Sequence, residues 1–221
     1  MVLSSSPDWF LGFDSLLEFL TTWIAFFIGY YSYKFFRISK NSKYFYLGFS
    51  FFAIALAYLA KAFTNILIYL EANRAEVWAI KVQNIAIIHD IGIIAYVALI
   101  LIAYITLVAL ALKIKDMRIL SLLVVTAVLA TIIGSSSLLF FHVLSFIFLL
   151  YIIPYFYTHY KQTRDAHSQI VVISFLLIAF SHLCFILLLT GHQLFYVYGE
   201  ITQLFGYLGL LMNLIWCLRY G

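Results

Sequence analysis

The chain has 221 residues, of which 66% are hydrophobic and 10% are charged, and its formal net charge is +4. A soluble domain is usually about 25% charged, so this composition excludes an ordinary water-soluble globular protein and indicates a membrane protein. The positive charge does not indicate nucleic-acid binding, because the basic residues are spread between long apolar segments instead of forming one patch.

Seven apolar segments follow one another along the chain. A helix needs about 20 apolar residues to cross a bilayer, and lipid forces the backbone into helix because it offers no hydrogen-bond partner. The sequence therefore predicts an all-α integral membrane protein with one seven-helix transmembrane domain over residues 1–221. Its spans are expected at about residues 9–36, 44–70, 82–112, 119–133, 138–157, 170–189 and 200–218.

The basic residues between the spans predict an orientation. With seven spans, one side of the membrane has only Arg74 and Lys81. The other side carries Lys34, Arg37, Lys40, Lys43, Lys113, Lys115, Arg118, Lys161, Arg164 and Arg219. By the positive-inside rule the N-terminus is outside and the C-terminus is cytoplasmic. We expect the protein in the plasma (cell) membrane.

An internal repeat is suggested by two segments that are 124 residues apart. The sequence SFFAIA at residues 50–55 resembles SFLLIA at residues 174–179. Spans one to three and five to seven would then form parallel halves joined by span four, a 3+1+3 arrangement of a kind that occurs in transporters. The other interpretation is a chance match between apolar helices.

Polar residues inside the spans gather in the predicted outer half of the membrane. A carboxylate such as Asp90 within hydrocarbon costs at least about 2.5–3.5 kcal/mol, so it needs a partner or a wet cavity. The sequence predicts a pocket for a small-molecule or ion ligand, or else plain polar packing. Its candidate residues are Glu18, Tyr58, Lys61, Asn65, His89, Asp90, His142, His182, Glu200 and Gln203.

Lys61 is the most informative single residue in this set. It lies too deep in the second span to reach the surface by extending its side chain. A buried lysine needs a counter-charge, and Asp90 or Glu18 is the expected partner. Such an ion pair either fixes helix packing or orders a ligand pocket.

The intramembrane histidines allow two cofactor interpretations. His89, His142 and His182, with Asp90 or Glu18, could hold a zinc-like ion, because three nitrogens and one oxygen suit that metal. Two of them could instead be axial ligands of a haem. Lining of a pocket without a cofactor is the third interpretation. No local spacing motif selects among them, and the sequence indicates no catalytic residue.

In architecture the chain resembles two seven-helix families. It is similar to microbial rhodopsins in span number, orientation and size, but the seventh span, EITQLFGYLGLLMNLIWCL, has no lysine for a retinal Schiff base. Retinal is therefore not expected. The chain also looks like a SWEET-type sugar transporter in span number and repeat, yet Pro154 is followed by Tyr155 where a proline–glutamine motif marks related transporters.

The sequence therefore favours a binding or sensing module over an enzyme. The partners that we expect are the lipid bilayer, a small ligand or ion, and a separate protein that receives the output; nucleic acid is not expected. The alternatives are a small-solute transporter of 3+1+3 architecture and a metal-dependent membrane hydrolase or haem-binding membrane protein.

Overall fold

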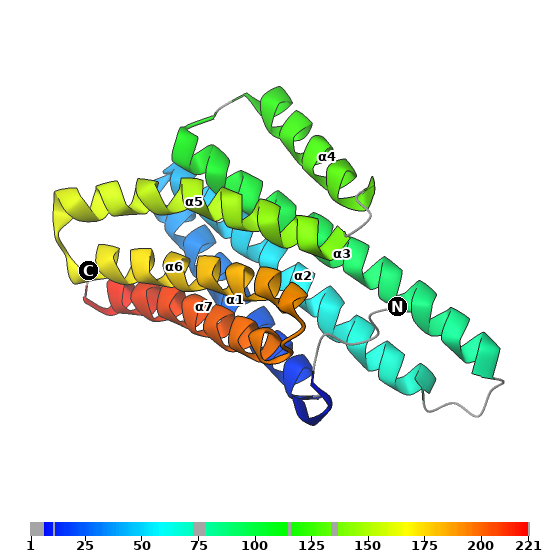
Figure 1. Ribbon diagram of the computed structural model, residues 1–221. Helices are drawn as coiled ribbons and strands as arrows, with labels where there is room; N and C mark the ends of the chain where they lie inside the picture. Colours follow the sequence, from blue (N-terminus) through cyan, green and yellow to red (C-terminus); the bar gives the residue numbers. More distant parts are fainter. Residues whose placement is uncertain (1–6, 11, 73–77, 115, 134–136, 221) are drawn as a thin grey trace.

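The computed structural model describes residues 7–10, 12–72, 78–114, 116–133 and 137–220, which form seven α-helices and two short 3-10 helices (Figure 1). The α-helices are α1 (Phe13–Ser39), α2 (Ser42–Ala72), α3 (Trp78–Leu112), α4 (Met117–Ile133), α5 (Ser137–Thr163), α6 (Ala166–Leu187) and α7 (Leu194–Tyr220). The 3-10 helices are η1 (Asp8–Phe10) and η2 (Leu188–Thr190). The all-α prediction is confirmed, and each predicted span corresponds to one helix.

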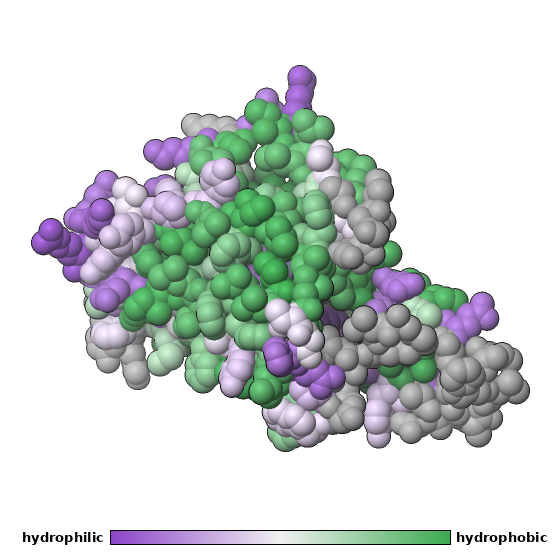
Figure 2. All heavy atoms as spheres, in the orientation of Figure 1, coloured by the Kyte–Doolittle hydropathy of each residue, from purple (hydrophilic) through white to green (hydrophobic). Residues whose placement is uncertain are grey.

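Five of these helices, α1, α2, α3, α5 and α6, are long and apolar enough to cross a membrane. The protein is therefore an integral membrane protein, and Figure 2 shows a broad hydrophobic face across the bundle. α4 has 17 residues, fewer than the roughly 20 that a span needs. α7 has 27 residues but is not among the five. Membrane crossing by α4 and α7 stays a prediction.

Six helices close into a ring in which each packs against the next, in the order α1, α2, α3, α5, α6, α7 and back to α1. α4 packs on α3 and α5 from outside the ring, and Figure 1 shows it set apart from the other helices. α2 and α3 are the longest helices, with 31 and 35 residues, and together they project beyond the rest of the bundle.

Glycines let neighbouring helices in the ring approach closely. A Cβ atom on Gly48 of α2 would lie 3.2 Å from the carbonyl oxygen of Gly29 in α1. One on Gly206 of α7 would lie 2.9 Å from the carbonyl oxygen of Ser174 in α6. Small residues at crossings are the usual means of packing helices in a membrane, where hydrophobicity alone does not hold helices together.

The connection from α5 to α6 is fixed by a helix cap. Asp165 is the N-cap of α6, and its Oδ1 accepts a hydrogen bond of 2.8 Å from the backbone N–H of Ser168. Hydrogen bonds from the side chain and then the backbone of Ser168 lower the pKa of this exposed carboxyl below its ordinary value. The cap therefore stabilises the fold most when Asp165 is ionised.

Replacing Asp165 with alanine should lower the free energy of unfolding by about 1 kcal/mol at neutral pH. Because the folded pKa is depressed, this contribution is present above the unfolded pKa and is lost as the pH falls through the folded one. Denaturant unfolding in mixed micelles at several pH values would measure it. Exposed Gln169→Ala, in the first turn of the same helix, is the control and should change stability by less than about 0.5 kcal/mol.

Candidate functional site

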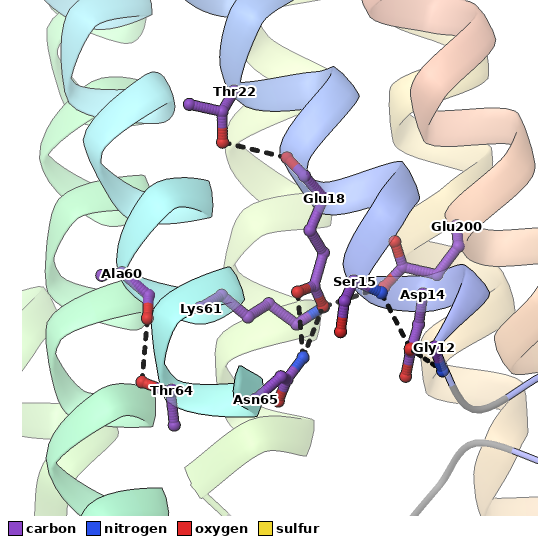
Figure 3. A network of polar contacts seen from close by, with 10 residues as sticks. All are labelled: Gly12, Asp14, Ser15, Glu18, Thr22, Ala60, Lys61, Thr64, Asn65 and Glu200. Carbon is purple, nitrogen blue, oxygen red and sulfur yellow. Dashed lines mark hydrogen bonds and ion pairs between the residues drawn. The ribbon is translucent and has the colours of Figure 1, made fainter. Parts of the chain in front are cut away.

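Three ionisable side chains from separate helices meet at the end of the ring where α1 and α7 begin (Figure 3). Lys61 of α2 places its Nζ 2.9 Å from Oε1 of Glu18 in α1 and 2.8 Å from Oε1 of Glu200 in α7. The Glu18 and Glu200 side chains are 0% and 4% exposed, whereas that of Lys61 is 24% exposed. We call these residues the charged triad. Lys61 is its accessible member.

Helical spacing explains how the triad forms. Asn65 follows Lys61 by four residues, so it lies on the same face of α2, and its Nδ2 donates to both Glu18 oxygens at 2.9 and 3.1 Å. Asp14 lies one turn before Glu18 in α1 and accepts from the backbone N–H groups of Gly12 and Ser15. An acidic residue in this first turn is favoured by the helix dipole.

Aromatic rings surround the ammonium group of Lys61. Its Nζ lies 5.4 Å from the ring centroid of Tyr96 and 5.9 Å from that of Tyr196. Both tyrosines are buried, and such distances allow cation–π attraction. The triad is therefore a carboxylate and aromatic environment built around a positive charge.

The charges of the triad do not balance. When all three groups are ionised, two carboxylates face one ammonium, which leaves a net charge of −1 among buried groups. Removing charges from water is costly unless they are paired. The site can therefore attract a further positive charge, whether a proton or a bound cation.

A second set of polar groups crosses the interior of the ring. His142 of α5 lies with its Nδ1 3.0 Å from Nδ1 of His182 in α6, and Nε2 of His182 lies 3.0 Å from the hydroxyl of Tyr104 in α3. That hydroxyl is 3.5 Å from the hydroxyl of Tyr207 in α7. We call these four residues the His–Tyr chain.

The His–Tyr chain can be hydrogen-bonded in either of two directions. If Tyr207 donates to Tyr104, then Tyr104 donates to Nε2 of His182, and Nδ1 of His182 donates to His142. In the other tautomers every bond is reversed and all contacts are kept. Such a chain remains neutral and satisfied while its protons shift together, which a proton pathway requires.

Two buried polar groups near these clusters make no hydrogen bond of good geometry with the part of the chain that the structure describes. They are the hydroxyl of Tyr58 and the Nε2 amide of Gln203, whose side chains are 1% and 2% exposed. The ring of Tyr58 packs edge-on against Tyr96 and Tyr207, so it lies between the triad and the His–Tyr chain. A buried group of this kind has an open hydrogen-bonding position that an ordered water molecule would satisfy.

Eight of the ten predicted site residues lie in two interior groups. Glu18, Lys61, Asn65 and Glu200 meet at the triad, and Tyr58, Gln203, His142 and His182 lie further along the interior. The prediction that Glu18 pairs with Lys61 is confirmed. The alternative, Asp90, is wrong, since the second carboxylate is Glu200.

His89 and Asp90 do not join the interior set. Their side chains are 40% and 76% exposed, and Nδ1 of His89 lies 3.5 Å from Oδ1 of Asp90. Both lie near the start of α3, the helix that projects beyond the bundle with α2. The prediction that Asp90 is buried in the interior is wrong, because its side chain lies on the outer surface of α3.

The predicted metal set of His89, Asp90, His142 and His182 is therefore split between the helix surface and the interior. Among the described residues, no group of three or more His, Cys, Asp or Glu side chains has an arrangement that could hold a metal ion. His142 and His182 remain together as a pair, with their Nδ1 atoms 3.0 Å apart.

Sequence reasoning missed Tyr96, Tyr104 and Tyr196 as neighbours of the site. Each is buried, and each contacts Lys61 or a histidine. A tyrosine within an apolar span is a usable signal, since its hydroxyl needs a partner that lipid does not provide.

No family model matches the chain, and neither a curated protein nor a solved structure is significantly similar to it.

Proposed function

We propose that this chain is a membrane-embedded binding module for a small monovalent cation, either an inorganic ion or a protonated amine, recognised at the charged triad. The observation that carries the proposal is the buried pair Glu18 and Glu200, which shares the single ammonium of Lys61. The aromatic faces of Tyr96 and Tyr196 favour the same kind of ligand.

The unpartnered groups extend the site toward the interior. The amide Nε2 of Gln203 is a donor and the hydroxyl of Tyr58 can donate or accept, so both could bind a water molecule that accompanies the cation. With the N-terminus outside, as the basic loops predict, this end of the bundle would face the exterior. The module would then respond to a ligand outside the cell.

The test is a thermal-stability titration of the purified chain in non-ionic detergent. Sodium, potassium and ethylammonium chlorides would each replace N-methyl-D-glucamine chloride at constant ionic strength. We expect at least one cation to raise the melting temperature saturably, because a ligand at 100 times its Kd stabilises the folded state by about 2.7 kcal/mol.

Glu200→Gln removes the uncompensated charge and should abolish this stabilisation. Asp90→Asn is the matched control, since it also converts a carboxylate to an amide but at an exposed position of α3, and it should bind as the wild type does. Equal stabilisation of the wild type and Glu200→Gln, or no stabilisation by any of the three cations, would contradict the proposal.

A second candidate function, small-solute transport, is favoured by the order of helices in the ring. α1–α2–α3 and α5–α6–α7 form two consecutive triplets, and α1 meets α7 just as α5 meets α3. This is the neighbour pattern expected of a parallel 3+1+3 repeat. Flux of the same three cations into proteoliposomes would support transport, and binding without flux would support the binding module.

A further inference from the structure

A groove with a volume of about 720 Å³ lies at the opposite end of the bundle, where α2 begins and α3 and α5 end. Its apolar lining includes Leu112 of α3 and Leu150 of α5. At its polar side are Lys43, Lys113 and Gln162. All five side chains are exposed, so the groove opens on the outer surface and is separate from the interior of the ring.

Both lysines are available to a ligand. In the part of the chain that the structure describes, no carboxylate forms a salt bridge with Lys43 or Lys113. The groove therefore combines two uncompensated positive charges with an apolar wall. Lys43 is the second residue of α2 and Lys113 follows the last residue of α3, so both lie where these apolar helices would reach the boundary of the membrane.

The backbone at this end places basic residues in an unusual conformation. Lys40 after α1, Lys113 after α3 and Arg164 after α5 have φ angles of 54°, 57° and 51°. Glycine is the common residue at such left-handed positions, and other residues adopt them at a cost of roughly 1–2 kcal/mol. Each of the helices α1, α3 and α5 is thus followed by a basic residue at a position where glycine would be less strained.

The helix dipole explains part of this preference, because a cation is favoured at a helix C-terminus. It does not explain why one of the three cations lines a groove together with Lys43 and apolar side chains. A ligand that matches the groove must carry negative charge at the membrane boundary and hydrocarbon below it. An anionic phospholipid has this chemistry, and basic pockets between helices are known sites for such headgroups.

We propose that this groove binds an anionic phospholipid, with the headgroup phosphate between Lys43 and Lys113 and an acyl chain along Leu112 and Leu150. Gln162 can donate a further hydrogen bond to the phosphate or glycerol oxygens. The lipid would seal α5 against α2 and α3 at this end. The charged triad takes no part in this site, so the proposal is independent of cation binding.

The test measures phospholipid binding to the full chain, delipidated in non-ionic detergent, by native mass spectrometry. We expect dioleoyl phosphatidylglycerol to bind at least tenfold more tightly than dioleoyl phosphatidylcholine. The double variant Lys43→Gln and Lys113→Gln should weaken phosphatidylglycerol binding by about 10- to 30-fold, the loss expected for two basic residues near an anionic headgroup. These lysines are exposed, so the variant should melt like the wild type.

The double variant Lys40→Gln and Arg164→Gln is the matched control. It also removes two positive charges from the same end, but neither residue lines the groove. It should change phosphatidylglycerol binding by less than about twofold. The proposal would be overturned if both double variants lost binding equally, if neither did, or if phosphatidylcholine bound as tightly as phosphatidylglycerol. Displacement of the lipid by equimolar glycerol 3-phosphate would overturn it too, because it would show that the acyl chain contributes nothing.

Discussion

Replacing Lys61 with methionine should lower the free energy of unfolding by about 3–5 kcal/mol, the usual cost of leaving a buried charge without its partner. Methionine keeps much of the side-chain volume, so the loss is electrostatic and not a cavity effect. Glu18 and Glu200 would then face each other with no ammonium between them. Unfolding in mixed micelles, followed by circular dichroism, would measure the change.

Two comparisons separate this cause from a general effect of removing a lysine. Lys34→Met, at an exposed position of α1, should change stability by less than about 0.5 kcal/mol. Adding Glu18→Gln and Glu200→Gln to Lys61→Met should restore most of the lost stability, because the unpaired carboxylates are gone. If the triple variant were as unstable as Lys61→Met alone, the carboxylates would not be the cause.

Glu200→Gln alone should be much milder than Lys61→Met. It leaves Lys61 paired with Glu18, so the remaining pair is neutral, and Asn65 still donates to both Glu18 oxygens. A double-mutant cycle between positions 61 and 200 would give the coupling energy directly. A negligible coupling would show that Glu18 alone balances Lys61.

The sequence predicts the depth of a polar residue in the membrane better than the direction in which its side chain points. The sequence places Glu18, Lys61 and Glu200 near the same end of the bundle, and the structure brings them together. The sequence places Asp90 there too, but its side chain points outward. In α3 nearly every residue is apolar, so no contrast between faces shows which one is inside the ring.

Where polar residues repeat along one helix, the direction could be predicted. Asp14, Glu18 and Thr22 follow one another at four-residue steps, and all three are buried. Asp90 has only the adjacent His89 beside it. Adjacent residues do not lie on the same face of a helix, so this pair does not define a polar face. The order of helices around the ring also decided which carboxylate reaches Lys61, because α7 packs next to α1 and brings Glu200 with it. Nothing local in the sequence specifies that order.

The second large effect is expected at His182, which is fully buried and bonded through both ring nitrogens. His182→Leu would leave Nδ1 of His142 without a partner and the Tyr104 hydroxyl with only its longer contact, 3.5 Å, to the Tyr207 hydroxyl. An unsatisfied buried polar group costs about 1–3 kcal/mol, so we expect the free energy of unfolding to fall by about 2–4 kcal/mol. Exposed His192→Leu is the control and should be nearly neutral.

A second substitution on the same chain distinguishes lost hydrogen bonds from disturbed packing. Tyr104→Phe removes the hydroxyl that loses its 3.0 Å partner in His182→Leu, so the two changes together should cost less than the sum of the two singles. Simple additivity would mean that the Tyr104–His182 contact of 3.0 Å contributes nothing to stability. Coupling of about 1 kcal/mol or more would show that the His–Tyr chain acts as one hydrogen-bonded unit across α3 and α6.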